Sequence, residues 1–463
     1  MSLLSAASRA GPSVQRTVLP GLVPFYASIE TPRYKADKVV KKAQPTAPVI
    51  SGRWVRKGEE KSRQRKRLPP FKPLPMSRKI EDFFDEKTMA NFEVSTLTPH
   101  ALRDPESVGQ ILQITPPEND PLRIFGLPRK LHSEYQILTK PYTVVREITK
   151  QTVDFLQKAR RQPSSGSRVV LTGRAGTGKS VLMLQAVEHC VQDGWVVVYI
   201  PRGIRLVDST TSYIYDLRSQ TYLQPAYSFQ ILQRMLTVNR EPLASLQLAD
   251  DLVLEKQTIS KGTTLERVIE YTISDKARAL PQAAAILDAV MRSLDAQKRF
   301  PVLLAVDEFQ ALYHKTTYRD PHFQRIQPYH LSIPRLIMEY ASGKRSFSRG
   351  AVIGALSLSQ TSFTLPLELR DALDLEDLDA YPISPFAKRN KEMFAYTEGL
   401  QKMAVPEKLT LAEAAGVFEV WKGTKVVGRE NYFFDEAFLG KYTESGGNAR
   451  DFVWKGILGS LDM

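Results

Sequence analysis

The feature that most constrains the fold of this chain is a glycine-rich segment at residues 173–180, which reads Gly-Arg-Ala-Gly-Thr-Gly-Lys-Ser. It fits the pattern G-x-x-x-x-G-K-[ST]. An apolar run at residues 169–171 precedes it, and a helical pattern at residues 181–190 follows and ends at the stop signal Gly194. A strand, a glycine loop and a helix in this order predict a phosphate-binding loop, because the N–H groups of such a loop converge on an anion at the helix N-terminus. A glycine-rich turn that binds nothing is the alternative.

The side chains of the loop suit different parts of a nucleotide. We expect the Lys179 amine to reach the terminal phosphates and the Ser180 hydroxyl to ligate Mg²⁺. The glycines let the backbone curl around the phosphates. The predicted cofactor-binding residues of the loop are Gly173, Gly176, Thr177, Gly178, Lys179 and Ser180.

Two acids follow a second apolar run, at residues 302–306, which suits a parallel strand buried on both faces. We expect Asp307 to hold Mg²⁺ through water, so that Ser180 and Asp307 together form the metal site. Glu308 stands where many P-loop ATPases keep the base that orients the attacking water, and it is the candidate catalytic residue. The alternative is that Glu308 is a surface acid after a strand end.

Apolar runs at residues 195–200 and 351–356 predict two more buried strands. Strands that alternate with helical patterns predict an α/β fold, with a parallel sheet flanked by helices. Ser359, just after the last of these strands, is a candidate sensor of the terminal phosphate, unless it belongs to a plain hydroxyl-rich turn. A helix over residues 142–161 is expected to cap the sheet, and mostly helical patterns at about 212–299 indicate an insertion.

The C-terminal part of the chain is predicted to be a helical lid. Thr410 and Glu413 form a capping box for a helix that runs to Trp421. A glycine-rich turn at residues 445–450 opens a further helix, and Arg450 in its first turn is positioned to aim a guanidinium at the nucleotide. An ordinary helix start with a solvent-facing arginine is the alternative.

The excess positive charge of the chain is concentrated at its N-terminus. Of the 64 Lys and Arg and the 50 Asp and Glu, residues 1–80 hold 18 and 4, which leaves 46 of each sign for the rest. Residues 1–28 contain Arg9, Arg16, serines and alanines but no acid, which is the composition of a mitochondrial transit peptide. Residues 29–80 contain clustered cations followed by prolines, which predicts a basic extended N-terminal arm that binds RNA. A solvated tail is the alternative for the arm.

These features predict five parts of the chain. They are the transit peptide (1–28), the arm (29–80), an N-terminal extension of the core (81–140), a nucleotide-binding domain (141–386) with its helical insertion, and the lid (387–463). The chain has one Cys, which cannot close an intramolecular disulfide, and no run of roughly 20 apolar residues predicts a membrane span. Its six His have no metal-ligand partners around Cys190.

Four segments in order carry a family resemblance, namely residues 171–180, 303–307, 351–360 and Tyr381-Pro382-Ile383. Over roughly residues 120–463 the chain resembles the death-associated protein three family, the nucleotide-binding protein of the mitochondrial small ribosomal subunit. The resemblance implies an AAA-like P-loop NTPase fold, a bound guanine nucleotide (GTP or GDP), and a place in the head of the small subunit, against ribosomal RNA and near the large subunit. It also implies that Gly176, Gly178, Lys179 and Ser180 bind phosphates and Mg²⁺, with Asp307 as the acidic partner. The turn Gly447-Asn448-Ala449-Arg450 is similar to the lid arginine motif of AAA-like proteins.

Two departures from related proteins bear on function. Asn390-Lys391-Glu392-Met393 lacks the final aspartate that pairs with guanine, so the preference for GTP or GDP over ATP rests on the resemblance alone. No segment can be named as an arginine finger, which argues against an enzyme of multiple turnover.

The leading hypothesis is a structural component of the mitochondrial ribosome, in the matrix, that supports translation. Its expected partners are the ribosomal RNA and neighbouring proteins of the small subunit, together with the large subunit, and it is not expected to be a homo-oligomer. The alternative is a mitochondrial AAA-like ATPase that remodels client proteins and works as a ring.

Overall fold

The computed structural model describes residues 94–115, 120–138, 140–254, 258–274, 279–375, 384, 386–423 and 435–460. All of them lie in one of two compact units of the chain, Arg67–Met463. The predicted transit peptide (1–28), the predicted arm (29–80) and Tyr381-Pro382-Ile383 lie outside the described residues.

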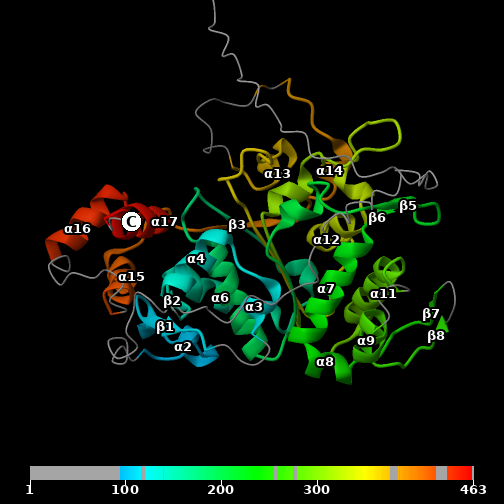
Figure 1. Cartoon of the computed structure of the whole chain (residues 1–463), viewed down its shortest axis with the longest axis horizontal. Coiled ribbons are helices and arrows are strands. Elements are labelled where there is room, and N and C mark those ends of the chain that lie inside the picture. Colours follow the sequence, from blue (N-terminus) through cyan, green and yellow to red (C-terminus); the bar gives the residue numbers. More distant parts are fainter. Residues whose placement is uncertain are drawn as a thin grey trace, which may run out of the picture. The chain divides into compact units, whose positions relative to one another are not determined.

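Five parallel strands form the main sheet, in the order β11-β3-β10-β9-β4, and Figure 1 labels one of them, β3. Four of them are rich in valine, isoleucine and leucine, which suit a strand that is buried on both faces. The prediction of an α/β fold with a parallel sheet is confirmed. The strands are β3 (Arg168–Thr172), β4 (Val196–Ile200), β9 (Val302–Asp307), β10 (Gly350–Ala355) and β11 (Gln401–Ala404).

Helices cover both faces of the sheet. Side chains of successive strand residues point to opposite faces and pack into two separate hydrophobic cores. In β3, Val169 and Leu171 pack with one core and Val170 with the other. The first core includes α3 (Pro121–Phe125), α5 (Glu147–Ala159) and α6 (Lys179–Gln192). The second includes α7 (Pro225–Val238), α11 (Ala283–Ala296) and α12 (Ser332–Ser342). As predicted, the helix after the glycine loop ends just before Gly194, which has a φ of 75°.

The edge strand β4 has its outward backbone groups bonded by a side chain. Asn239, directly after α7, accepts the Val197 N–H at 2.7 Å and donates to the Val197 carbonyl at 2.9 Å. Asn239 is buried, so this contact satisfies polar groups that water does not reach. It also occupies part of an edge that would otherwise be open to further strand pairing.

The predicted helix over residues 142–161 is wrong at its start. Tyr142–Val144 form a strand, β2, which pairs antiparallel with β1 (Ile111–Gln113), and helix α5 begins at Glu147. Aromatic and β-branched residues in a row favour an extended backbone, and that preference prevails here over the helical spacing of the apolar positions. Two more helices in this part are α2 (Pro99–Arg103) and α4 (Arg129–Ile137).

Helices dominate the segment between β4 and β9, as the patterns predict, but two hairpins were not predicted. The further helices are α8 (Arg240–Ser245) and α9 (Leu265–Ser274). One hairpin consists of β5 (Ile214–Asp216) and β6 (Thr221–Leu223), and the other of β7 (Leu252–Val253) and β8 (Thr258–Ile259). Short 3₁₀ turns of this segment and of the chain before and after it are Pro105–Ser107, Ser164–Gly166, Gly203–Leu206, Phe309–Tyr313 and Pro328–His330.

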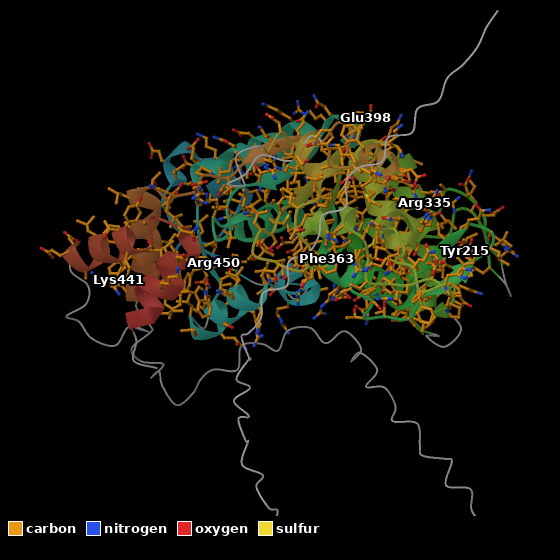
Figure 2. The ribbon with its side chains drawn as sticks, turned by 90° about the horizontal axis from the view of Figure 1, so that it is seen from above. Tyr215, Arg335, Phe363, Glu398, Lys441 and Arg450 are labelled. Atoms are coloured by element: carbon orange, nitrogen blue, oxygen red, sulfur yellow. The ribbon has the colours of Figure 1, made fainter. Side chains whose placement is uncertain are left out.

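The C-terminal segment, predicted as helical throughout, also supplies a strand of the main sheet. β11 pairs with β3 and is mostly exposed, so it lacks the apolar run by which the other strands were found. The capping box is confirmed, because Thr410 N–H donates to Glu413 and the Glu413 N–H donates to Thr410. Figure 2 shows Lys441 and Arg450 on the last helices. The helices here are α13 (Leu367–Ala372), α14 (Lys391–Phe394), α15 (Leu411–Gly423), α16 (Asp435–Glu444) and α17 (Ala449–Asp451), with a π-helical turn at Phe452–Ile457 and a 3₁₀ turn at Leu458–Ser460.

Within the described residues no helix has both the length and the apolar character needed to cross a bilayer.

Candidate functional site

The glycine-rich loop joins β3 to the first residue of α6. Three of its glycines have positive φ angles, 132° at Gly173, 88° at Gly176 and 94° at Gly178. L-residues with side chains rarely adopt these angles, which explains why glycine stands at these positions. The Lys179 amine bends back over the loop and donates to the carbonyls of Gly173 (2.7 Å) and Arg174 (2.6 Å).

Lys179 is an almost buried cation, with 6% of its surface exposed. The pKa of its amine is lowered to about 8, chiefly by burial; the negative charge of Asp307 opposes this shift and the positive charge of Arg450 adds to it. The three charged groups that the sequence assigned to one site therefore lie close enough to interact. An anion next to this amine would stabilise its charged form.

Asp307 ends β9 at the same edge of the sheet. Burial raises the pKa of its carboxyl group, while hydrogen bonds from the Ser180 hydroxyl and the Glu308 N–H and the charge of Lys179 lower it. The predicted metal pair, Ser180 and Asp307, thus lies close together, and both residues line the same cavity. A hydroxyl and a carboxylate are ligands that Mg²⁺ accepts, with water and phosphate oxygens completing its octahedron. Among the described residues no group of three or more His, Cys, Asp or Glu could hold a metal ion by itself.

Glu308 is buried, with 8% of its surface exposed, so the interpretation as a surface acid is wrong. Its backbone has a φ of 57°, which is uncommon for a residue with a side chain and turns the chain sharply after β9. Its carboxylate accepts from the Ile204 N–H at 3.4 Å and from the Gln360 amide at 3.3 Å. Burial raises the pKa of Glu308, the charge of Asp307 adds to that rise, and Arg202 opposes it.

Ser359 lies after β10, at the third strand end of this edge. Its hydroxyl is 3.2 Å from the hydroxyl of Ser357. The Ser357 backbone is tied to Gln310, whose amide donates to the Ser357 carbonyl at 2.8 Å and accepts the Ser357 N–H at 3.0 Å. The turn after β10 is therefore held in place by a side chain next to β9.

The predicted lid contacts the loop through its glycine-rich turn. The Asn448 amide donates to the Ala175 carbonyl, and the Arg450 N–H donates to the Gly176 carbonyl, both at 3.0 Å. A Cβ atom on Gly176 would lie 2.3 Å from the Asn448 amide oxygen. Glycine at this position thus allows both the positive φ and the close contact with the lid.

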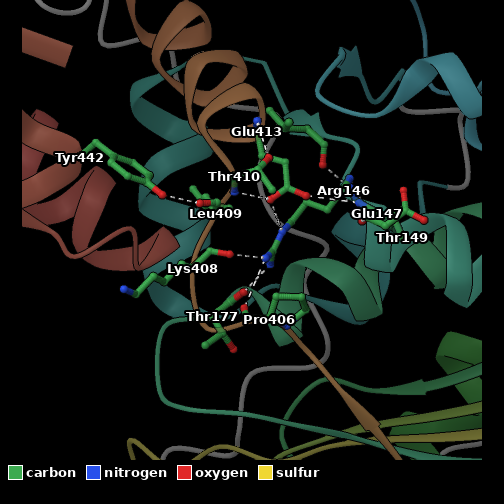
Figure 3. A network of polar contacts seen from close by, with 12 residues as sticks. Arg146, Glu147, Thr149, Thr177, Pro406, Lys408, Leu409, Thr410, Glu413 and Tyr442 are labelled. Carbon is green, nitrogen blue, oxygen red and sulfur yellow. Dashed lines mark hydrogen bonds and ion pairs between the residues drawn. The ribbon is translucent and has the colours of Figure 1, made fainter. Parts of the chain in front are cut away.

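Arg146, between β2 and α5, connects the loop with the lid helix α15 (Figure 3). Its guanidinium donates to the Thr177 carbonyl at 2.7 Å and to the Glu413 carboxylate at 3.2 Å. It also donates to the carbonyls of Pro406 and Lys408, each at 3.3 Å. Glu413 therefore caps its own helix and binds a cation that holds the loop.

A cavity of about 740 Å³ lies between these elements, a size within the range of small-molecule sites. All of the predicted site residues except Gly173 line it, and Gly173 instead lies beneath the Lys179 amine. Its walls also include α4, α15 and the π-helical turn, which contribute the apolar side chains of Leu131, Val417, Val420, Trp421 and Val453. Asn390 and Lys391, at the start of α14, are not among its lining residues.

Residues 143–454 match the family described as mitochondrial ribosomal death-associated protein 3. The chain belongs to this family. The small ribosomal subunit protein mS29 of Neurospora crassa is 24% identical over 380 residues, which cover 80% of this chain and 77% of that protein. The protein of the same name from Schizosaccharomyces pombe is 24% identical over 369 residues (79% and 75%), and the one from Mus musculus 25% over 238 residues (51% and 59%).

Membership of this family confirms the resemblance drawn from the sequence, and the predicted location on the mitochondrial ribosome with it. The comparisons give no support to the alternative of a remodelling ATPase.

The structure of this family member also shows site residues that the sequence did not single out. Arg146 and Glu134 line the cavity, but no local motif marks either position. Glu413 was recognised only as a cap, and Asn448 only as part of the lid turn. Their contacts join segments far apart in the sequence, so nothing in the local pattern could reveal them.

Proposed function

We propose that the chain is a structural component of the small subunit of the mitochondrial ribosome and that it binds a purine nucleotide with Mg²⁺ in the cavity. The relatives in Neurospora and Schizosaccharomyces are small-subunit proteins by name and match most of this chain, which supports the ribosomal part. We further propose that the core is an AAA-like P-loop NTPase fold, with residues 387–463 as its lid, and that its ribosomal neighbours include the large subunit.

One observation carries the nucleotide part of this proposal. Three successive carbonyls of the loop, those of Ala175, Gly176 and Thr177, accept hydrogen bonds from Asn448, Arg450 and Arg146 outside the loop. In a trans peptide the carbonyl and the following N–H point in opposite directions. The next three N–H groups therefore point away from these donors, which leaves them available to a phosphate group and supports the proposal.

The remaining residues suit a nucleotide with magnesium. Lys179 supplies a cation beside the loop, and the N-terminus of α6 adds its partial positive charge. Ser180 and Asp307 would hold Mg²⁺, which neutralises phosphate charge when bound. Ser359 and Arg450 line the same cavity and would contact the nucleotide from β10 and from the lid.

The role that we propose for this nucleotide is structural. A ligand that binds only the folded chain stabilises it by RT ln(1+[L]/Kd), which is about 4 kcal/mol at a thousandfold excess over Kd. Because the ligand would lie between the loop and the lid, this free energy would favour the arrangement in which both contact the sheet. Turnover is not needed for such a role, and Glu308 is proposed only as the base of a slow hydrolysis. By the family resemblance the nucleotide is GTP or GDP, with ATP as the alternative.

The test is Lys179→Ala in the full chain, with Lys298→Ala, an exposed lysine, as the matched control. We expect Lys179→Ala to lose the melting-temperature increase that nucleotide and Mg²⁺ produce, and to enter ribosomal particles less well on gradients of mitochondrial lysate. The control should behave as the wild type. An unchanged response to nucleotide and normal incorporation of Lys179→Ala would refute the proposal, and a homo-hexamer free of ribosomal RNA would revive the ATPase.

We also propose that residues 29–80 bind ribosomal RNA through their cations. Each phosphate that the arm neutralises should add to the dependence of RNA affinity on salt. The logarithm of the RNA affinity against the logarithm of salt concentration is therefore compared for the full chain and for a chain without residues 29–80. A shallower slope after deletion supports the proposal, and equal slopes contradict it.

A further inference from the structure

The cavity is also lined by apolar side chains from outside the loop, which suit a flat apolar group. Leu131 and Tyr135 come from α4, Leu138 directly follows it, and Val420 and Trp421 come from α15, while Arg129 and Lys130 of α4 line the cavity as well. Positions 131, 135 and 138 recur at the spacing of one helix face, so α4 presents a continuous wall. Because the loop lines the same cavity, a nucleotide with its phosphates at the loop would place its base against this wall.

Three carboxylates line the cavity, and Glu134 on α4 is the one outside the loop and metal region. Its Oε1 atom accepts a hydrogen bond from the Trp454 indole N–H at 2.5 Å. Lys130, one turn earlier on α4, lies 5.2 Å from the centre of the Trp454 ring. These contacts orient a carboxylate beside the apolar side chains of this wall.

Guanine and adenine differ in what they offer to such a carboxylate. Guanine presents two adjacent donors, the N1–H and the 2-amino group, and the two oxygens of an ionised carboxylate accept both at once. Adenine presents an acceptor at N1, which an ionised carboxylate repels. The Oε1 atom can accept from Trp454 and from a base together, because each carboxylate oxygen has two lone pairs.

We propose that Glu134 selects guanine by accepting hydrogen bonds from its N1–H and 2-amino groups, an inference that rests on the proposed nucleotide site. The carboxylate that Asn390-Lys391-Glu392-Met393 lacks is thus supplied by α4, in a part of the cavity that α14 does not line. Glu134 is ionised for this task above neutral pH, since burial raises its pKa to about 7 while Trp454 and Lys130 hold it down.

The test measures binding of GDP, ADP and xanthosine diphosphate, each with Mg²⁺, to the full chain and to Glu134→Gln. We expect the wild type to prefer GDP over ADP, and Glu134→Gln to lose about tenfold to a hundredfold in GDP affinity, the range for one bidentate contact to a base. Xanthine has a carbonyl where guanine has its 2-amino group, so the new amide should donate to it. Glu134→Gln should therefore gain affinity for xanthosine diphosphate.

A purely structural Glu134 would give a different result. Glutamine still accepts the Trp454 N–H, so a Glu134 that only holds Trp454 would leave the affinities for all three nucleotides unchanged or shift them together, with no gain for xanthosine diphosphate. That outcome, or an unchanged preference for GDP, overturns the inference. Lys179→Ala separates the two hypotheses, because it should weaken every nucleotide alike. If the wild type binds none of the three, the proposed nucleotide site itself fails.

Discussion

Arg146→Met should destabilise this protein more than any other single loss of charge around the cavity. The guanidinium donates to four acceptors at 2.7–3.3 Å, one in the loop and three at residues 406–413, and only 12% of the side chain is exposed. Methionine keeps most of the aliphatic stem, so the substitution chiefly removes the charge and its hydrogen bonds.

The expected size of the effect follows from the partner that remains. Glu413 has 4% of its side chain exposed and would keep only backbone donors, the N–H groups of Glu147 at 3.3 Å and Thr410 at 3.1 Å. Removing one member of a buried ion pair costs about 3–5 kcal/mol, because the other charge stays buried without compensation. Release of the Thr177 carbonyl adds to this loss and should also weaken nucleotide binding.

Equilibrium urea unfolding of the full chain measures the loss, with Arg335→Met as the control. Arg335 pairs with Glu339 on the surface of α12 (Figure 2), where such a pair contributes about 0.3–0.5 kcal/mol. A double-mutant cycle of Arg146→Met with Glu413→Gln should give a coupling of about 1–3 kcal/mol. Additive losses, or a loss for Arg146→Met no larger than that of the control, would refute the reasoning.

Three other substitutions probe the fold around the site. Gly176→Ala should lose more stability than Gly262→Ala, which has nearly the same φ (86° against 88°) but open space at its Cβ, and equal melting temperatures would contradict the close approach of the lid. Burial raises the pKa of Glu188 from 4.5 to about 8. Its contribution to the free energy of unfolding is therefore complete below pH 4.5, where the carboxyl group is protonated in both states. That contribution is lost as pH rises from 4.5 through 8, by up to about 1.4 kcal/mol per pH unit. Urea unfolding across this range should therefore show a flatter pH dependence in Glu188→Gln, and an unchanged profile would assign the dependence to other groups. Asn239→Ala leaves the buried N–H and carbonyl of Val197 without partners and should cost about 2–4 kcal/mol, and a loss below about 1 kcal/mol would mean that water replaces the amide.

The sequence predicts those elements of the fold whose signal lies within one short stretch of residues. β9 and β10 are runs of apolar residues, and the loop carries its own glycines, so each is recognisable without its neighbours. β11 is different, since its residues Gln401–Ala404 are mostly exposed and become a strand only because β3 offers an unpaired edge. The strand β2 was missed for the same reason, because its partner β1 lies some thirty residues earlier.

The same distinction holds for the candidate site. Lys179, Ser180 and Asp307 could be assigned from the sequence because each follows a strand whose carboxyl end must lie at one edge of a parallel sheet. Arg146 could not, because its acceptors at Thr177 and Glu413 are 31 and 267 residues away. A cation that folds back onto a loop carbonyl has the same sequence signature as one that faces water.

The way the loop is held would link the proposed nucleotide to the rest of the subunit. Because Asn448 and Arg450 of the lid bind the loop through its carbonyls, displacement of the lid removes donors that fix the loop's shape. A ligand that needs this shape must favour the lid in place, and by linkage any partner that holds the lid in place must tighten the ligand by the same factor. A ribosomal neighbour that contacts α15 or α16 would thus strengthen nucleotide binding without touching the nucleotide. Nucleotide affinity should accordingly be higher in the assembled subunit than in the free chain.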